Sequence, residues 1–301
     1  LYSSAASDVY KRQGLTHQKL LNAGLELVEG WPQLLAQAQS LANSFIVGGH
    51  GRRRAGNGDT FWQFRPARQG DNLKDIDWRR TAQGDENFIR QNEWQAAQSI
   101  QFWVDGSASM QFHSSADSKH KRAAFVSLAL AILLSNAGER VGTIDGKLPT
   151  KQGRIQVEEM AKLFSLPTKN DFGSPEIDYF QSHSLMVFAS DFFGDVKLLE
   201  KAVTAAANLQ MSGVLLMILD PVEITFPFSG RTVFESMAGQ IRHESQQANG
   251  LKSKYLAVLK DRQDKLQALA QSVGWQFHCH TTDSSPVDAL IWLYGALGNQ
   301  R

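Results

Sequence analysis

The sequence has little of several features that define large classes of protein. Its 301 residues include a single cysteine, Cys279, which excludes an internal disulfide and a zinc site built from cysteines. Basic residues exceed acidic residues by one, so a general polyanion binder is not expected. No apolar run reaches the roughly 20 residues that cross a bilayer, and the longest, residues 123–134, is predicted to be a buried helix. What remains is an ordinary globular protein, long enough for one large domain or two modest ones.

The N-terminal region is expected to differ from the rest of the chain. Residues 8–13 match the translation of a transposon end that is widely used to prepare sequencing libraries. Residues 1–13 are therefore predicted to be a non-native, adapter-derived segment. Residues 14–97 are expected to form two amphipathic helices, broken at 30–32, and then a small β unit with strands at 60–65 and 87–94. No signal peptide is visible, and we expect a cytoplasmic protein.

Residues 98–301 alternate predicted strands with predicted helices. The strands are short apolar runs, and the helices carry apolar residues every three to four positions. Alternation at these lengths is typical of a parallel sheet that helices cover on both faces. We therefore predict an α/β fold with a doubly wound, mostly parallel sheet, extended by the N-terminal helices and the small β unit. The predicted strands are 99–104, 140–145, 184–191, 213–220 and 275–279; the predicted helices are 121–137, 155–164, 196–209, 251–272 and 287–297; and a β-hairpin insertion is predicted at 223–234.

Three oxygen-bearing side chains follow the first of these strands at alternate positions. Asp105, Ser107 and Ser109 lie in the loop at its carboxyl end, and alternate residues of an extended turn point the same way. One carboxylate and two hydroxyls can therefore converge on one point. Mg²⁺ prefers such oxygen ligands and usually keeps positions open for water or for a partner's carboxylate. The alternative is a solvated turn, which a second acid at a neighbouring strand end makes less favourable.

The spacing Asp-x-Ser-x-Ser at a strand end resembles the metal-ion-dependent adhesion site of von Willebrand factor A domains. In that family a later strand-end aspartate and a threonine from a second loop complete the site. The resemblance implies that Asp191, at the end of the strand predicted at 184–191, is the distal ligand. It also implies that Thr150, just before the helix predicted at 155–164, supplies the threonine. The ion it implies is Mg²⁺, with Mn²⁺ as the alternative.

Five blocks of residues occur in a fixed order along the chain: Phe61–Arg65, Gln69–Asp71, Ile76–Arg79, Thr81–Ala82 and Asp105–Met110. Their succession resembles the bacterial domain-of-unknown-function family fifty-eight, over nearly all of the chain after the adapter-derived segment. The resemblance implies a von Willebrand factor A-like domain of the short soluble type, without the membrane helices of many relatives. Genes of that family commonly lie beside MoxR-type AAA+ ATPases. This implies a cytoplasmic, metal-dependent protein-interaction module, a partner or adaptor of such an ATPase in the assembly or maturation of other proteins.

Two other functions remain as alternatives. A hydrolase or phosphatase would use the same metal, but the residues from Gly106 to Met110 do not fit the Gly-x-Ser-x-Gly motif of serine hydrolases. We expect no enzyme. A nucleic-acid binder would use the basic patch Arg52–Arg54, for which a solvated or partner-facing surface is the favoured interpretation. The side chains that would assist this patch are Arg65, Arg79, Arg80, Trp62 and Trp78.

Two smaller groups of residues have both a structural and a functional interpretation. Asp71, Asp77 and Trp78 suit turns and caps that fix the small β unit, the alternative being a direct functional contact. His278 and His280 share one face of a predicted strand and would suit a metal pair. Because no third ligand is near in the sequence, we expect them to be structural.

Overall fold

The computed structural model divides the chain into two compact units. Residues 46–97 form the smaller unit, and helix 32–43 belongs with the residues from Gln98 onward to the larger. The structure describes residues 32–43, 55–68, 71–72, 74, 76–82, 86–93, 97–115, 117–166, 168, 170–239 and 242–298. The predicted adapter segment, the first predicted helix and the patch Arg52–Arg54 lie outside these residues. In the described part, no helix is long and apolar enough to cross a membrane.

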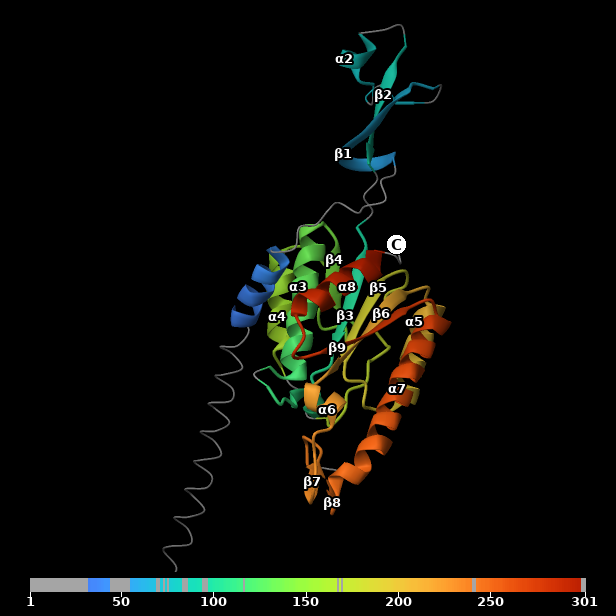
Figure 1. The fold of residues 1–301 in the computed structure, drawn as a ribbon. Coiled ribbons are helices and arrows are strands. Elements are labelled where there is room, and N and C mark those ends of the chain that lie inside the picture. The colour runs from blue at the N-terminus through green and yellow to red at the C-terminus, as the bar shows by residue number, and fades with distance from the viewer. Residues whose placement is uncertain are drawn as a thin grey trace, which may run out of the picture. The chain divides into compact units, whose positions relative to one another are not determined.

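The larger unit is built on a five-stranded sheet in which all neighbouring strands are parallel (Figure 1). Its strands are β3 (Ser99–Val104), β4 (Arg140–Thr143), β5 (Leu185–Ser190), β6 (Ser212–Leu219) and β9 (Gln276–Thr281). Their order is β4-β3-β5-β6-β9. The chain starts in β3, passes to β4 on one side and then to β5 on the other, so the direction of winding reverses between β3 and β5. In open parallel sheets, ligands bind beside the carboxyl ends of the strands at such a switch point.

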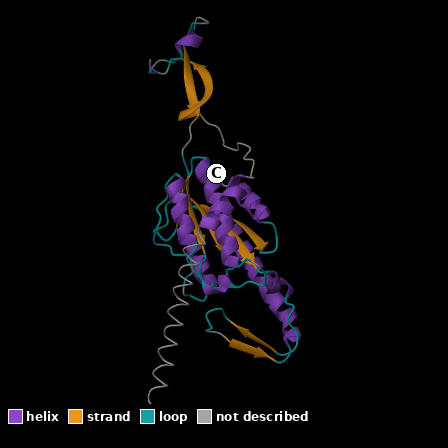
Figure 2. Cartoon of the chain, turned by 90° about the vertical axis from the view of Figure 1, so that its left-hand side faces the viewer, coloured by secondary structure: helices purple, strands orange, loops and turns teal. Residues whose placement is uncertain are grey.

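Helices cover both faces of this sheet (Figures 1 and 2). One face is covered by α3 (Lys119–Asn136), α4 (Arg154–Phe164), α8 (Pro286–Gly298) and helix 32–43, and the other by α5 (Val196–Asn208) and α7 (Lys252–Ser272). Each face has its own cluster of buried apolar side chains, because successive strand residues point to opposite faces. Val187 lies in one cluster and Phe188 in the other. The predicted fold class, an α/β protein with a doubly wound parallel sheet, is confirmed.

Helix 32–43 packs on the larger unit. Leu34, Ala38, Leu41 and Ala42 are buried in the same apolar cluster as α3, α4 and α8, and their spacing is that of one face of an amphipathic helix. The sequence interpretation grouped this helix with the small β unit in residues 14–97. In the structure the helix contributes instead to the core of the parallel-sheet unit.

The start of α3 follows from its capping residue. Ser118 Oγ accepts a hydrogen bond from Lys121 N at 3.1 Å, which satisfies one of the free N–H groups of the first turn. The helix therefore begins at Lys119, two residues before the predicted start. From Ala123 onward it is apolar on nearly all sides, as expected of a helix buried between neighbours. The earlier start matters because it places Lys119 in the first turn, close to the ends of the strands.

The insertion after β6 differs in position from the prediction at 223–234. It consists of the helix α6 (Pro221–Thr225) and the antiparallel hairpin β7 (Thr232–Glu235) and β8 (Arg242–Ser245). Asp220 starts the helix, because its side chain accepts backbone N–H groups while the Glu223 side chain accepts the N–H of Asp220. A hairpin was correctly predicted here, but its strands lie mostly C-terminal to the predicted range.

The smaller unit pairs β1 (Ala55–Pro66) with β2 (Phe88–Glu93) in an antiparallel arrangement, and the short helix α2 (Trp78–Thr81) comes between them in the sequence. Asp71 accepts hydrogen bonds from both terminal nitrogens of Arg65, at 2.7 and 2.6 Å, and a third from Arg68 N. Asp77 caps α2 by accepting a hydrogen bond from Arg80 N. These contacts agree with the turn and cap roles that the sequence favours.

Candidate functional site

Asp105 and Asp191 lie at the same rim of the parallel sheet. Asp105 follows β3 and Asp191 follows β5, the two strands on either side of the switch point. These strands are in register up to Val104 opposite Ala189, and Asp105 N donates to the Ala189 carbonyl oxygen at 2.9 Å. Both side chains are buried, with exposed fractions of 2% and 1%. The two acids that the sequence pointed to are therefore neighbours at the carboxyl ends of adjacent strands.

The loop after β3 brings Ser107 and Ser109 beside Asp105. Asp105 Oδ1 accepts a hydrogen bond from Ser107 N at 2.8 Å, which closes a tight turn. The chain then forms a short 3₁₀ helix, η2 (Ala108–Gln111), and Ser109 Oγ lies 3.2 Å from Ser107 Oγ. Neighbouring oxygen ligands of an octahedral Mg²⁺ are about 2.9 Å apart. The two buried hydroxyls thus have nearly the separation that one small cation requires.

Two other segments hold the Asp105 carboxylate in place. Ser190 Oγ, at the end of β5, donates to Asp105 Oδ2 at 2.6 Å. Gly173 lies so close that a Cβ atom there would overlap the carboxylate. Burial raises the pKa of the Asp105 carboxyl, against the hydrogen bonds from Ser190 and Ser107, and the negative charge of Asp191 raises it further. A buried carboxylate beside a second one is stabilised when a cation is near.

Asp191 is paired with Lys119, a residue that the sequence pattern did not single out. Lys119 Nζ lies 2.9 Å from Asp191 Oδ2 and 2.6 Å from Glu223 Oε1, and the side chains of Lys119 and Asp191 are each 1% exposed. Burial disfavours the charged lysine, but the two carboxylates outweigh it and the pKa of Lys119 is raised. Burial also raises the pKa of Glu223. With Asp105, three carboxylates and one ammonium share this region.

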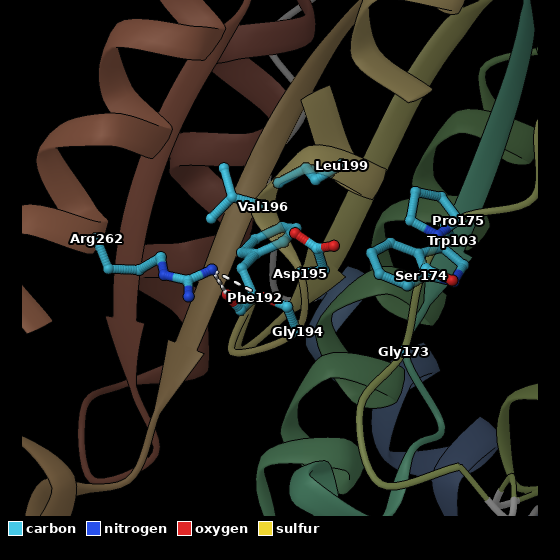
Figure 3. A pocket seen from close by; sticks show the side chains of 10 residues that line it. All are labelled: Trp103, Gly173, Ser174, Pro175, Phe192, Gly194, Asp195, Val196, Leu199 and Arg262. Carbon is cyan, nitrogen blue, oxygen red and sulfur yellow. Dashed lines mark hydrogen bonds between the residues drawn. The ribbon is translucent and has the colours of Figure 1, made fainter. Parts of the chain in front are cut away.

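The loop that carries Asp191 is tied to two other elements. Asp191 N donates to Met110 Sδ, in η2, at 3.1 Å. Figure 3 shows Arg262 reaching from α7 to the same loop, where its Nη1 donates to the carbonyl oxygens of Phe192 at 3.1 Å and Gly194 at 2.9 Å. These contacts fix the position of the Asp191 backbone from both sides.

The segment between α4 and β5 runs alongside the Asp-x-Ser-x-Ser loop. Thr168 N donates to the Gly106 carbonyl oxygen at 2.7 Å, and Ser109 N donates to the Asp171 carbonyl oxygen at 2.9 Å. Backbone hydrogen bonds of this kind hold two loops together without depending on their side chains. The contacts join residues about 60 positions apart in the chain, so their spacing in the sequence gave no sign of them.

The prediction that Thr150 completes the site is wrong. Its Oγ1 lies 2.9 Å from Gln181 Oε1 and 3.4 Å from Ser99 Oγ. Ser99 is the first residue of β3, whereas Asp105 follows the last, so Thr150 lies at the opposite end of this strand. The chain reaches the rim of Asp105 at the end of β4 and turns back before Thr150. It returns to that rim after α4, where a different threonine, Thr168, adjoins the loop.

The histidines of β9 belong to a different part of the unit. The ring of His278 stacks on Trp292 at 4.9 Å between centroids, and His280 Nε2 lies 3.3 Å from Arg122 Nη1. Each histidine therefore has its own packing partner, in line with the structural role expected for them. Burial lowers the pKa of both, and that of His280 falls to about 4.

The donor set of the strand-end site suits a hard cation. Within the described residues, no group of three or more histidine, cysteine, aspartate or glutamate side chains is arranged to hold a metal, so any ion here depends on the serine hydroxyls as well. All ligands offered here are oxygen atoms, from the hydroxyls of Ser107 and Ser109 and the carboxylate of Asp105. Mg²⁺ and Mn²⁺ bind oxygen ligands well, whereas softer metals prefer nitrogen or sulfur. The excess of carboxylate over ammonium also fits a divalent cation. The four residues Asp105, Ser107, Ser109 and Asp191 thus fit the predicted ion.

The fold and this site define a doubly wound α/β protein with a candidate cation site at its switch point. A family model described as "Protein of unknown function DUF58" matches residues 63–264, and the chain belongs to that family. Among solved structures, the chain is similar to one titled "Crystal structure of conserved hypothetical protein BatB from Bacteroides thetaiotaomicron". The sequence identity is 13% and the TM-score 0.39, over 68% of this chain and 100% of that chain. No curated protein matches the sequence.

Proposed function

We propose that this protein is a metal-dependent protein-interaction module. Asp105, Ser107 and Ser109 hold Mg²⁺, with Mn²⁺ as the alternative ion, and Asp191 contributes directly or through water. A glutamate or aspartate of a partner protein fills an open position of the ion. The observation that carries the proposal is that two buried acids end adjacent strands at the switch point of the sheet, and that the loop of the first also carries two hydroxyls 3.2 Å apart.

The charges around Asp105 support a cation at this position. Asp191 already has the ammonium of Lys119 as a partner. The backbone N–H of Ser107 and the hydroxyl of Ser190, which donate to the Asp105 carboxylate, are neutral. A buried carboxylate without a cation nearby destabilises its surroundings. A bound divalent ion would compensate Asp105 and, once partly coordinated by the protein, would still attract a carboxylate from outside.

The partner in this proposal is a MoxR-type AAA+ ATPase, with which the protein acts as an adaptor in the assembly or maturation of other proteins, in the cytoplasm. The support for this partner is the resemblance of the sequence blocks to a family whose genes commonly lie beside such ATPases. The proposed role is binding without catalysis. In support, Ser107 Oγ contacts Ser109 Oγ, and the nearest buried histidine, His120, has its Nδ1 3.0 Å from the Asp105 carbonyl oxygen rather than at a serine.

Capture of the ATPase tests this function. The immobilised protein should retain a purified MoxR-type ATPase in excess Mg²⁺ and release it in EDTA, and Asp105→Asn should not retain it. Asp178→Asn, an equal change at an exposed acid, is the matched control and should behave as the unchanged protein. Capture that neither EDTA nor Asp105→Asn reduces would contradict the proposed mechanism. Hydrolysis of simple phosphoesters that Asp191→Ala abolishes would favour a metal-dependent hydrolase or phosphatase instead.

A further inference from the structure

A pocket of about 260 Å³ adjoins the candidate cation site and shares Ser109 with it. Nearly half of its lining residues are aromatic, and we call it the aromatic pocket. Lys119 and residues of the strand β7 also line it. The aromatic side chains that line it include Phe112, Phe193, Phe226, Phe228, Phe234 and Tyr255.

The aromatic walls support one another. The ring of Phe226 lies 5.2 Å from Phe228, 5.7 Å from Phe234 and 4.8 Å from Tyr255, measured between centroids. Phe228 and Phe234 also meet edge to face at 5.3 Å. Tyr255 belongs to α7 and Phe234 to β7, so these contacts fasten the hairpin insertion to a long helix. The pocket is therefore formed by packed side chains and not by a single loop.

The charged groups that line the aromatic pocket are mainly acidic. They are Lys119, Asp171, Glu223 and Glu235, three carboxylates against one ammonium. The ammonium of Lys119 is already paired with Glu223 and with Asp191 behind it. Glu235 is exposed at the mouth of the pocket. A guest that carries positive charge is thus favoured over an acidic or a neutral one.

Asp171 is the least satisfied of these groups. Its residue is 8% exposed, and its Oδ1 accepts a hydrogen bond from Ala238 N at 3.1 Å. Its Oδ2 is buried and has no hydrogen-bond partner in the described part of the chain. Buried carboxylate oxygens are normally hydrogen-bonded, so Asp171 places a negative charge with an unsatisfied oxygen beside the pocket, and a cationic guest would stabilise it.

We propose that the aromatic pocket binds the side chain of an arginine from the partner protein. A guanidinium has five N–H donors, stacks on aromatic rings and loses less hydration than an ammonium when it is buried. It would lie against the phenylalanine rings with its charge close to the Asp171 carboxylate. Because Ser109 also lines the pocket, the partner would present this arginine close to the acid that completes the metal site. The inference depends on the proposed function only for the partner's acid at the metal site.

A model compound tests the aromatic pocket without any metal. Met237 lines the pocket, so its labelled methyl group reports on binding by NMR, while the buried Met160 outside it serves as the internal reference. In EDTA, Nα-acetyl-arginine amide should shift the Met237 signal saturably, with a Kd on the order of millimolar, as expected of a single side chain. The citrulline analogue, which has the same shape without the charge, should bind about tenfold more weakly.

Variants complete the test. Asp171→Asn keeps the acceptor for Ala238 N but loses the charge, and it should weaken binding of the arginine amide about fivefold to tenfold. Phe228→Leu should weaken it as well, whereas Asp178→Asn at an exposed position should not. Equal binding of the citrulline analogue, stronger binding of Nα-acetyl-phenylalanine amide, or no saturable shift at all would overturn the inference. Because EDTA is present throughout, these outcomes are separate from failure of the metal site.

Discussion

Lys119 is a buried ammonium whose two partners are carboxylates, so its replacement is expected to lower stability strongly. Replacing it with methionine keeps most of the side chain's volume but leaves Asp191 and Glu223 buried without a cation. Removing one partner of a buried ion pair typically costs about 3–5 kcal/mol. Lys119→Met should therefore lower the free energy of unfolding, measured by urea titration, by roughly that amount.

The control for this change lies on the same helix. Lys121 is 53% exposed and pairs with Asp117, and an exposed pair contributes at most about 1 kcal/mol. Lys121→Met should thus have little effect. The double variant Lys119→Met, Glu223→Gln should recover part of the loss, because one of the two unpaired charges is gone. A change of less than 1 kcal/mol for Lys119→Met would show that the two carboxylates are compensated by other means.

Among the residues of the candidate site, the sequence predicted those that belong to a local pattern. It did not predict those that only tertiary contacts place at the site. Asp105 and Asp191 were predictable because each ends a short apolar strand, and parallel strands end at one rim. Gly173 lies against the Asp105 carboxylate, although the two residues are nearly 70 positions apart in the chain. The residues next to Gly173 in the sequence give no indication of this contact. Thr150 was placed by analogy with a second loop, and the direction of the chain around β4 puts it at the other end of the sheet.

At the scale of elements, β9 and α3 are joined by a contact that depends on pH. Arg122, in α3, lies 3.3 Å from His280 Nε2 and donates to the carbonyl oxygens of Ser284 and Thr282. The pKa of His280 is lowered to about 4, chiefly by burial and also by the charges of Arg122 and His278, against the opposing effect of Asp288 and Asp283. In the unfolded chain histidine has a pKa of about 6.5. As the pH falls, His280 is therefore protonated in the unfolded chain at a higher pH than in the folded protein.

The folded protein therefore loses stability in acid. The stabilisation is fully present above about pH 6.5 and is lost as the pH falls toward 4, and it amounts to about 3 kcal/mol. In urea titrations, His280→Gln, which keeps an acceptor for Arg122 but does not titrate, should lose this part of the pH dependence. His243→Gln, at an exposed strand position, should retain it. Identical pH profiles for the unchanged protein and His280→Gln would rule out this origin.

The elements were largely predictable because each is a short segment with a clear period. The strands of the parallel sheet are continuous apolar runs, and every end of every strand was predicted to within two residues. The hairpin was misplaced, because the capping of α6 by Asp220 and Glu223 takes up the first residues of the insertion. Such a cap is visible in the sequence, but alternating residues between 223 and 234 suggested a strand more strongly.

At the scale of the whole molecule, the chain consists of two compact units, and the larger contains the candidate cation site, the aromatic pocket and helix 32–43. Helix 32–43 was grouped with the small β unit only because the two are neighbours in the sequence. The helix is buried against α3, α4 and α8. An amphipathic pattern predicts that one face of a helix is buried, but it does not predict which elements cover that face. The two-layer covering of the sheet, in contrast, follows from the alternation of strands and helices.

A calorimetric titration of Mg²⁺ into the whole chain is the decisive experiment for the proposed metal site. We predict one saturable site, lost in Asp105→Asn and in the double variant Ser107→Ala, Ser109→Ala, and weakened at least tenfold in Gly173→Ala, where a methyl group would overlap the Asp105 carboxylate. Asp178→Asn and Gly295→Ala, which has open space at the new Cβ, should bind as the unchanged protein does. Binding of equal strength in Asp105→Asn, or no binding to the correctly folded chain, would contradict this prediction.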